Sequence, residues 1–146
     1  MEESLSLLGK IKETFGCGEI DVKTYSPLAL AFMGDCIFEI IIRTVVVERG
    51  NRQAQGLHNT KSAVVNAKVQ AKMAEALLPE LTEEELACYK RGRNAKPHTT
   101  AKNASLSEYR KATGLEALYG YLYLSDREDR LLELTKTGLE KVDITI

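Results

Sequence analysis

The chain has 146 residues, of which 44% are hydrophobic and 28% charged, and its net charge is −1. This composition is ordinary for a globular protein and excludes a disordered chain, and the length predicts one domain with its own core. Because the charges nearly balance, a nucleic-acid surface would require a local concentration of basic residues.

The N-terminal end and the cysteines indicate the compartment. The first residues, MEESLSLLGKIKE, lack the basic start and apolar run of a signal peptide. Cys17, Cys36 and Cys88 have no CxxC spacing, so neither a disulfide framework nor a zinc site is suggested. The apolar segment 28–47 contains three charges, which makes it a poor membrane span. We therefore expect a cytoplasmic protein without a membrane segment.

The first 25 residues leave two outcomes open, a short helix or a loosely ordered segment. We expect residues 1–25 to be an N-terminal extension of the main domain. A long helix should follow, because Ser26 is a suitable N-cap, Pro27 suits the first helical position and Gly50 can end the helix.

Three charges lie on one stripe of this otherwise apolar helix. Asp35, Glu39 and Arg43 are spaced four residues apart, so they share one helix face. A helix that is apolar almost all round is expected to be buried, and a carboxylate on it needs a cation, a donor or a metal. Glu39 has Arg43 one turn away, which favours a structural ion pair. Asp35 has no such partner and is the better candidate for chemistry.

The middle of the chain also shows helical patterns. Apolar residues at helical spacing predict a helix over about 59–78, with Pro79 beyond it. Thr82 and Glu85 then form a capping box, which opens a third helix that continues through Tyr89.

The last part of the chain contains a polar loop and two more predicted helices. The loop covers about 93–105, and a fourth long helix over 107–124 follows it. Ser125 and Asp126 are expected to cap a fifth helix that extends through Leu139. No alternating strand pattern of useful length is present, so the sequence predicts an all-α fold.

A basic segment follows the third helix. Residues 90–102, KRGRNAKPHTTAK, hold five lysines and arginines and no acid. Basic residues at a helix C-terminus can simply complement the helix dipole, which would explain two or three of these charges. Their continuation through a polar loop favours contacts with phosphate oxygens. The candidate RNA-binding residues are Lys90, Arg91, Arg93, Asn94, Lys96 and Lys102.

A second acid lies on a mostly apolar helix, within the sequence TGLEALYGYLYL. Glu116 is flanked by Gly114 and Gly120, each of which costs a helix about 1 kcal/mol relative to alanine. That cost is understandable if another helix approaches closely, and Gly34 beside Asp35 suggests the same. The two acids could converge on one divalent cation. Pairing of Glu116 with a lysine or arginine elsewhere remains an equal alternative.

Four segments together resemble the ribonuclease III family and, more closely, its Mini-ribonuclease III branch. They are LALAFMGD at 28–35, LHNTKS at 57–62, KRGRNAKPHTTAK at 90–102 and LEALYGYLYL at 115–124. Any one motif would be weak, but four in matching order are strong. The resemblance implies a ribonuclease III endonuclease-domain-like helical bundle at residues 26–141, followed by a short tail at 142–146. No double-stranded-RNA-binding domain is expected to follow.

The resemblance also implies roles for the two acids. Asp35 and Glu116 match the metal-binding, catalytic acids of the family. The chain has Ala31 and Thr113 where full-length ribonucleases III have two further acids, a departure that resembles the Mini type. Thr113, like Glu39 and Arg43, is therefore expected to support the site structurally. With fewer carboxylates, a bound Mg²⁺ would keep more of its waters.

The activity implied by the resemblance is Mg²⁺-dependent hydrolysis of double-stranded RNA, with Mn²⁺ as a possible substitute. The implied substrate is precursor 23S ribosomal RNA, cut by a homodimer with one site per subunit. The excess apolar surface of segment 28–47 independently predicts a two-fold dimer. A non-catalytic helical RNA-binding protein, which would not need the two acids, and a helical scaffold are the alternatives.

Overall fold

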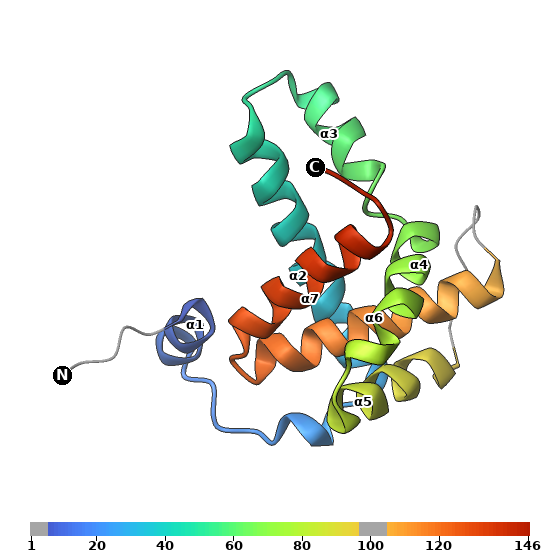
Figure 1. Ribbon diagram of the computed structural model, residues 1–146. Coiled ribbons are helices and arrows are strands. Elements are labelled where there is room, and N and C mark those ends of the chain that lie inside the picture. Colours follow the sequence, from blue (N-terminus) through green and yellow to red (C-terminus); the bar gives the residue numbers. More distant parts are fainter. Residues whose placement is uncertain (1–5, 97–104) are drawn as a thin grey trace.

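The computed structural model describes residues 6–96 and 105–146, and this part of the chain is helical, with no strand. The all-α prediction is thus confirmed. The elements, shown in Figure 1, are α1 (Leu7–Phe15), η1 (Val22–Thr24), α2 (Pro27–Arg49), α3 (Ala54–Ser62), α4 (Ala67–Leu77), η2 (Leu78–Glu80), α5 (Glu83–Asn94), α6 (Leu106–Leu124) and α7 (Glu128–Lys141). None of the described helices is both long enough and apolar enough to cross a bilayer.

Helix α6 is the centre of the fold. It packs against α2, α4, α5 and α7, which surround it in Figure 1, whereas α3 extends alongside the end of α2. From Ala112 to Tyr123, every residue of α6 except Glu116 is buried. A helix enclosed on nearly all sides should be apolar all round, as the sequence of this segment is. Glu116, the only acid in this stretch, is also its only less buried position.

Helices α2 and α6 cross in backbone contact. A Cβ atom at Gly34 would lie 1.6 Å from the carbonyl oxygen of Glu116, and one at Gly120 would lie 1.9 Å from that of Leu30. No side chain fits at either glycine, so the predicted close approach of another helix is confirmed. The crossing places Asp35, the neighbour of Gly34, directly beside the Glu116 segment.

The prediction of one helix over 59–78 is wrong. Two helices, α3 and α4, occupy this region, and α3 begins at Ala54. Asn66 causes the break, because its Oδ1 accepts from the Val69 N–H at 3.0 Å and its Nδ2 donates to the Ser62 carbonyl at 3.1 Å. One side chain therefore caps the start of α4 and the end of α3.

Other helix ends agree with the sequence to different degrees. The capping box of Thr82 and Glu85 is present, and α5 continues to Asn94, within the predicted loop. Helix α6 is capped by Ser105 rather than beginning at Ser107. The predicted cap at 125–126 is wrong: Asp126 has a φ of 60°, and α7 starts after Arg127 without a side-chain cap.

The N-terminal segment contains a helix, α1, which Ser6 caps at its start and Gly16, with a φ of 63°, at its end. Of the two outcomes that the sequence leaves open for this segment, the structure therefore shows the short helix.

Helix α2 is only partly buried in the single chain, whereas its apolar sequence predicts a buried helix. Its Phe38 is 1% exposed, but Phe32 is 83% exposed. The large apolar surface of α2 is therefore not used up by this chain's own core.

Candidate active site

The structure brings Asp35 of α2 and Glu116 of α6 together. The Asp35 carboxyl lies within hydrogen-bonding reach of the Glu116 carboxyl. The glycine crossing explains this, because it brings the two backbones into contact beside the acids. Asp35 is exposed to solvent, which corrects the expectation that its helix would bury it, while Glu116 is half-buried. The pair thus has an open side at Asp35 and an enclosed side at Glu116.

The electrostatics of the pair are unfavourable without a cation. Burial, together with the neighbouring Asp35 carboxyl, raises the pKa of Glu116 to about 9. Within residues 6–96 and 105–146, no lysine, arginine or histidine forms an ion pair with Glu116. The structure therefore does not support the alternative in which Glu116 pairs with a basic residue in the described part. A strongly shifted acid facing another acid is a typical feature of a functional site.

A third polar side chain, Gln70 of α4, lies beside the same carboxyl. It is 5% exposed, and its amide opposes the rise of the Glu116 pKa. Gln70 is not among the site residues predicted from the sequence. The available signal was a polar side chain within the apolar pattern Val69, Ala71 and Ala74, which occupies the inner side of α4.

The two facing acids fit a magnesium ion. Carboxylate oxygens are hard ligands of the kind that Mg²⁺ prefers, and a cation would relieve the repulsion between Asp35 and Glu116. The described residues contain no cluster of three or more histidine, cysteine, aspartate or glutamate side chains that could hold a metal. Two acids without a third suit an ion that keeps much of its water shell.

The two positions where full-length ribonucleases III have further acids, 31 and 113, supply none here. Thr113 is buried, and its hydroxyl donates to the Tyr109 carbonyl at 3.0 Å. Ala31, one turn before Asp35, is also buried. Both positions are thus buried and carry no carboxylate.

The predicted ion pair of Glu39 is present, with one additional partner. Arg43 Nε donates to Glu39 Oε1 at 2.7 Å, and Lys61 Nζ lies 3.0 Å from the same oxygen. Burial acts to raise the pKa of Glu39, but Lys61 and Arg43 outweigh it and hold this pKa below its usual value. Lys61 belongs to α3, so the cluster ties α3 to α2 one turn from Asp35.

The basic candidates lie on more than one side of α5. Arg91 donates to the Tyr25 carbonyl at 3.2 Å, and thus faces the segment before α2. The Arg93 guanidinium lies over the Tyr89 ring, 5.8 Å from its centroid, and donates to Asn94 at 3.2 Å. Lys90 and Lys96 are exposed, and Lys102 lies outside the described residues.

A surface pocket collects some of these groups. Its volume is about 300 Å³, and its lining residues are Arg93, Asn94, Leu106, Ser107, Arg110 and Lys111. Lys111 is paired with Glu75, whereas Arg110 is an exposed cation that the sequence analysis did not include. Arg110 belongs to α6, so only the fold brings it next to Arg93.

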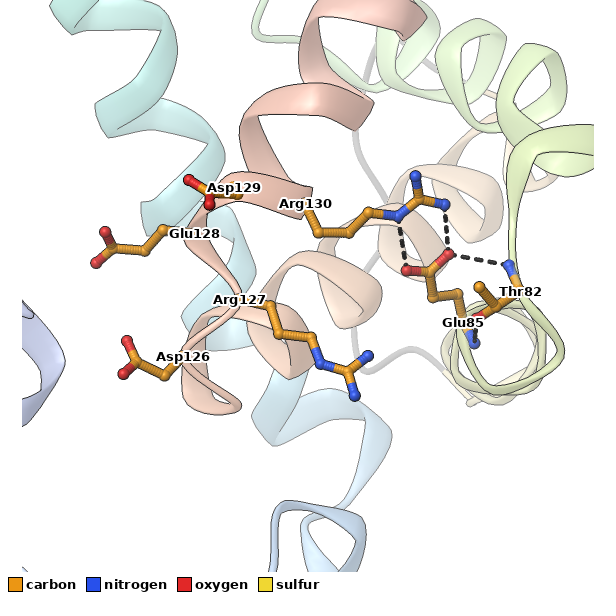
Figure 2. Close-up of a pocket in the computed structure, with 7 residues that line it drawn as sticks. All are labelled: Thr82, Glu85, Asp126, Arg127, Glu128, Asp129 and Arg130. Atoms are coloured by element: carbon orange, nitrogen blue, oxygen red, sulfur yellow. Dashed lines mark hydrogen bonds and ion pairs between the residues drawn. The ribbon is translucent and has the colours of Figure 1, made fainter.

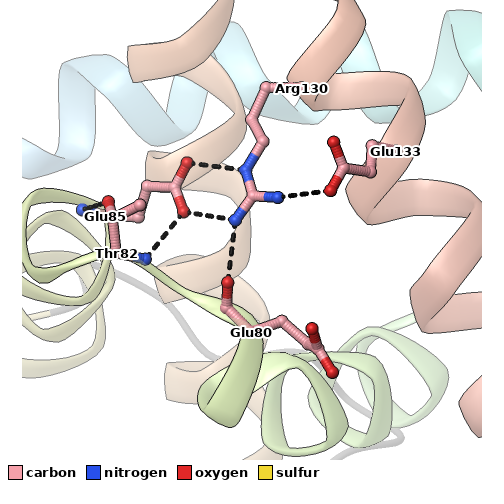
Figure 3. A network of polar contacts seen from close by, with 5 residues as sticks. All are labelled: Glu80, Thr82, Glu85, Arg130 and Glu133. Carbon is pink, nitrogen blue, oxygen red and sulfur yellow. Dashed lines mark hydrogen bonds and ion pairs between the residues drawn. The ribbon is translucent and has the colours of Figure 1, made fainter.

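A second acidic centre has the opposite character. Arg130 of α7 donates to both carboxylate oxygens of Glu85, at 2.9 and 2.7 Å, and also to Glu133 and to the Glu80 carbonyl (Figure 3). The Thr82 N–H donates to the same carboxylate. Arg130 and these donors hold the pKa of Glu85 below its usual value.

A surface pocket of about 550 Å³ lies beside this pair. Figure 2 shows that Asp126, Glu128 and Asp129 point away from Glu85 and Arg130, so these acids do not converge on a common point. The Glu85 carboxylate is neutralised by Arg130, so it is suited to holding helices together rather than to chemistry.

Comparison with known proteins agrees with this geometry. A model of the Ribonuclease III domain matches residues 28–127. Mini-ribonuclease 3 from Enterococcus faecalis is 48% identical over 127 residues, covering 86% of this chain and 96% of the relative. Mini-ribonuclease 3 from Streptococcus pneumoniae is 40% identical, covering 85% and 98%. A crystal structure of a Fusobacterium nucleatum protein superimposes with a TM-score of 0.75 at 33% identity, covering 84% and 98%.

The bundle and its facing acids thus define a helical nuclease domain. The chain belongs to the ribonuclease III family, in its Mini-ribonuclease III branch. Membership in this family makes the protein an endoribonuclease.

Proposed function

We propose that the protein cleaves double-stranded RNA with a divalent cation held by Asp35 and Glu116, with Mg²⁺ as the natural ion and Mn²⁺ as a substitute. The observation that carries this proposal is the contact between two acids that have no cation partner in the described part. When bound, the ion supplies an activated water and neutralises charge on the phosphate.

The chain's own residues have separate tasks in this mechanism. Glu116 of α6 is the less exposed acid, beside Asp35 of α2 and Gln70 of α4, and provides the fixed carboxylate. Asp35 is exposed and is the carboxylate that an RNA phosphate can approach. Glu39, held by Arg43 and Lys61, keeps the α2 face next to Asp35 in place. We propose that residues 26–141 form the catalytic domain, with residues 1–25 as an extension and 142–146 as a tail.

Recognition of RNA would depend on its backbone. The bases of A-form RNA are hidden in a deep, narrow groove, so proteins read its shape, its phosphates and its 2′-hydroxyls. We assign phosphate contacts to Lys90, Arg91, Arg93, Asn94, Lys96 and Lys102, and add Arg110 because it shares a pocket with Arg93. Arg91 already donates to Tyr25, so this residue has a structural task as well.

The exposed side of α2 supports a homodimer. Phe32, Cys36 and Ile40 are exposed and spaced four residues apart, next to the stripe that starts with Asp35. A two-fold contact along these residues would bury them and leave one acid pair on each subunit, which suits one cut per RNA strand. Light scattering should give twice the 16.2 kDa chain mass, and Phe32→Glu should shift this mass toward the monomer.

The proposed natural substrate is precursor 23S ribosomal RNA, trimmed in the cytoplasm at a paired stem. The test is incubation of a long RNA duplex with the protein in Mg²⁺ and in EDTA, followed by sizing of the products. Asp35→Asn and Glu116→Gln should remove cleavage, whereas Glu48→Gln, an exposed acid further along α2, should not. Binding without cleavage by the wild-type protein would favour the non-catalytic alternative.

A further inference from the structure

Gln70 is the polar residue that the fold explains least. It lies on the buried side of α4, with Ala71, Met73, Ala74 and Leu77 as buried neighbours along the helix. Its Nε2 atom is buried and has no hydrogen-bond partner within the described residues. Burying an amide without a partner destabilises a fold, and an apolar residue of the same size would avoid this. Folding alone therefore does not account for a glutamine here.

The position of Gln70 suggests what the amide is for. Helix α4 packs on α6, and the Gln70 side chain lies beside the Glu116 carboxyl. Glu116 thus has Asp35 of α2 and Gln70 of α4 as its two polar neighbours. An N–H donor favours the ionised form of a carboxylate, which is the form that binds a cation. The free donor and the acid without a cation lie together.

We propose that Gln70 is a positioning residue, whose Nε2 donates to ionised Glu116 and orients this carboxylate toward the cation that it shares with Asp35. This inference rests on the proposed metal site. Groups that orient a metal ligand in this way typically contribute 10–100-fold to metal affinity. In the structure as it stands, this Nε2 is a buried donor without a partner, which destabilises the fold.

The experiment compares Gln70→Met with the wild-type full chain in two measurements. Met has similar length and no donor. In EDTA, thermal unfolding of Gln70→Met should occur at the wild-type temperature or a few degrees above it, because an unpaired buried amide is removed. Binding of Mn²⁺, followed by electron paramagnetic resonance, should weaken by roughly 10–100-fold. Gln55→Met, on exposed α3, is the matched control and should change neither quantity.

A second variant tests the direction of the hydrogen bond. Gln70→Glu replaces the donor by an anion, so Mn²⁺ binding should also weaken if Gln70 acts as a donor. Tighter binding would mean that the residue contributes an oxygen ligand, and would overturn the proposal. Wild-type Mn²⁺ affinity in Gln70→Met, or a clear loss of its stability in EDTA, would overturn it as well. If the wild-type protein bound no Mn²⁺ and cleaved RNA in EDTA, the proposed function itself would fail.

Discussion

Glu85 and Glu116 are both acids in helices of one bundle, yet their surroundings are opposite. Glu85 is 1% exposed and accepts from Arg130 and from a backbone N–H, so its pKa is lowered (Figure 3). Burial, and the Asp35 carboxyl that it faces, raise the pKa of Glu116 to about 9. A fully partnered carboxylate joins α5 to α7, whereas a carboxylate short of partners is available to a ligand. Burial acts to raise the pKa of both acids, and only at Glu85 does a cationic partner outweigh it.

The largest expected effect is the loss of cleavage when the unpartnered pair is altered. Asp35→Asn and Glu116→Gln should each reduce the rate of duplex cleavage by roughly 10³-fold, the scale associated with removing one group that stabilises a transition state. Folding should persist, because neither acid holds a structural partner in the described part. Circular dichroism and single-turnover cleavage would test this together. Normal cleavage by a folded variant would remove the role assigned to that acid.

Breaking the Glu85–Arg130 pair should lower stability and leave cleavage nearly unchanged. Glu85→Gln leaves the partly buried Arg130 with only the more exposed Glu133 as a counter-ion, and we expect a loss of about 3 kcal/mol of unfolding free energy, near the lower end for such pairs. Urea unfolding measures this loss. The double variant Glu85→Leu with Arg130→Met should recover much of it, because the only charge then left without its partner is the exposed Glu133 carboxylate. Cleavage per folded molecule should remain close to wild type in both variants.

The contrast also shows how far the sequence reaches. The Glu39–Arg43 pair and the capping box of Thr82 and Glu85 could be predicted because their members are three or four residues apart. Bonding of Glu85 to Arg130 could not, because 45 residues separate the two. Likewise, Lys61, Gln70 and Arg110 reach their neighbours only through helix packing.

Helix boundaries followed the same rule. Ser26 and Pro27 marked the start of α2 because N-caps act locally. Asn66 caps α4, but the apolar pattern continues on both sides of it and therefore predicts one helix where α3 and α4 form. Asp35 and Glu116, the proposed active-site acids, can be singled out because a charge within an apolar helix is conspicuous. Exposure of Asp35 was not foreseen, since it depends on what covers α2.

Stability should depend on pH in opposite directions at the two sites. In EDTA, folded Glu116 keeps a proton that the unfolded chain loses above about pH 4.5, so its effect is to lower the unfolding free energy as pH rises toward 9. Glu85 has a lowered pKa, so its contribution is present above pH 4.5 and is lost as pH falls further. Urea unfolding across pH measures both. Glu116→Gln should remove the decline on the alkaline side only, and Glu85→Gln should weaken the decline on the acid side only.

The smallest effect concerns the basic residues. Arg91 donates to the backbone of another segment, whereas Lys96, Arg110 and Arg93 are the residues proposed to contact RNA only. Lys96 is exposed, and Arg93 and Arg110 line one surface pocket. All three should contact RNA phosphates. Replacing all three by glutamine should weaken duplex binding without changing sequence preference. Each lost contact should also flatten the slope of log affinity against log salt, by roughly 0.7–0.9 of a unit. Binding curves at several salt concentrations in Ca²⁺, which slows cleavage, give this slope.

Arg91→Gln is the matched comparison for these three residues, because it lies on the same helix α5 but already donates to Tyr25. Arg91→Gln should change the salt slope by less than the loss of one phosphate contact does. It should lower thermal stability, because the segment before α2 loses its hydrogen bond to α5. An unchanged slope in a well-folded triple variant would mean that the RNA lies elsewhere. The net charge of −1 makes the comparison sensitive, because the chain has no general basicity to supply non-specific binding.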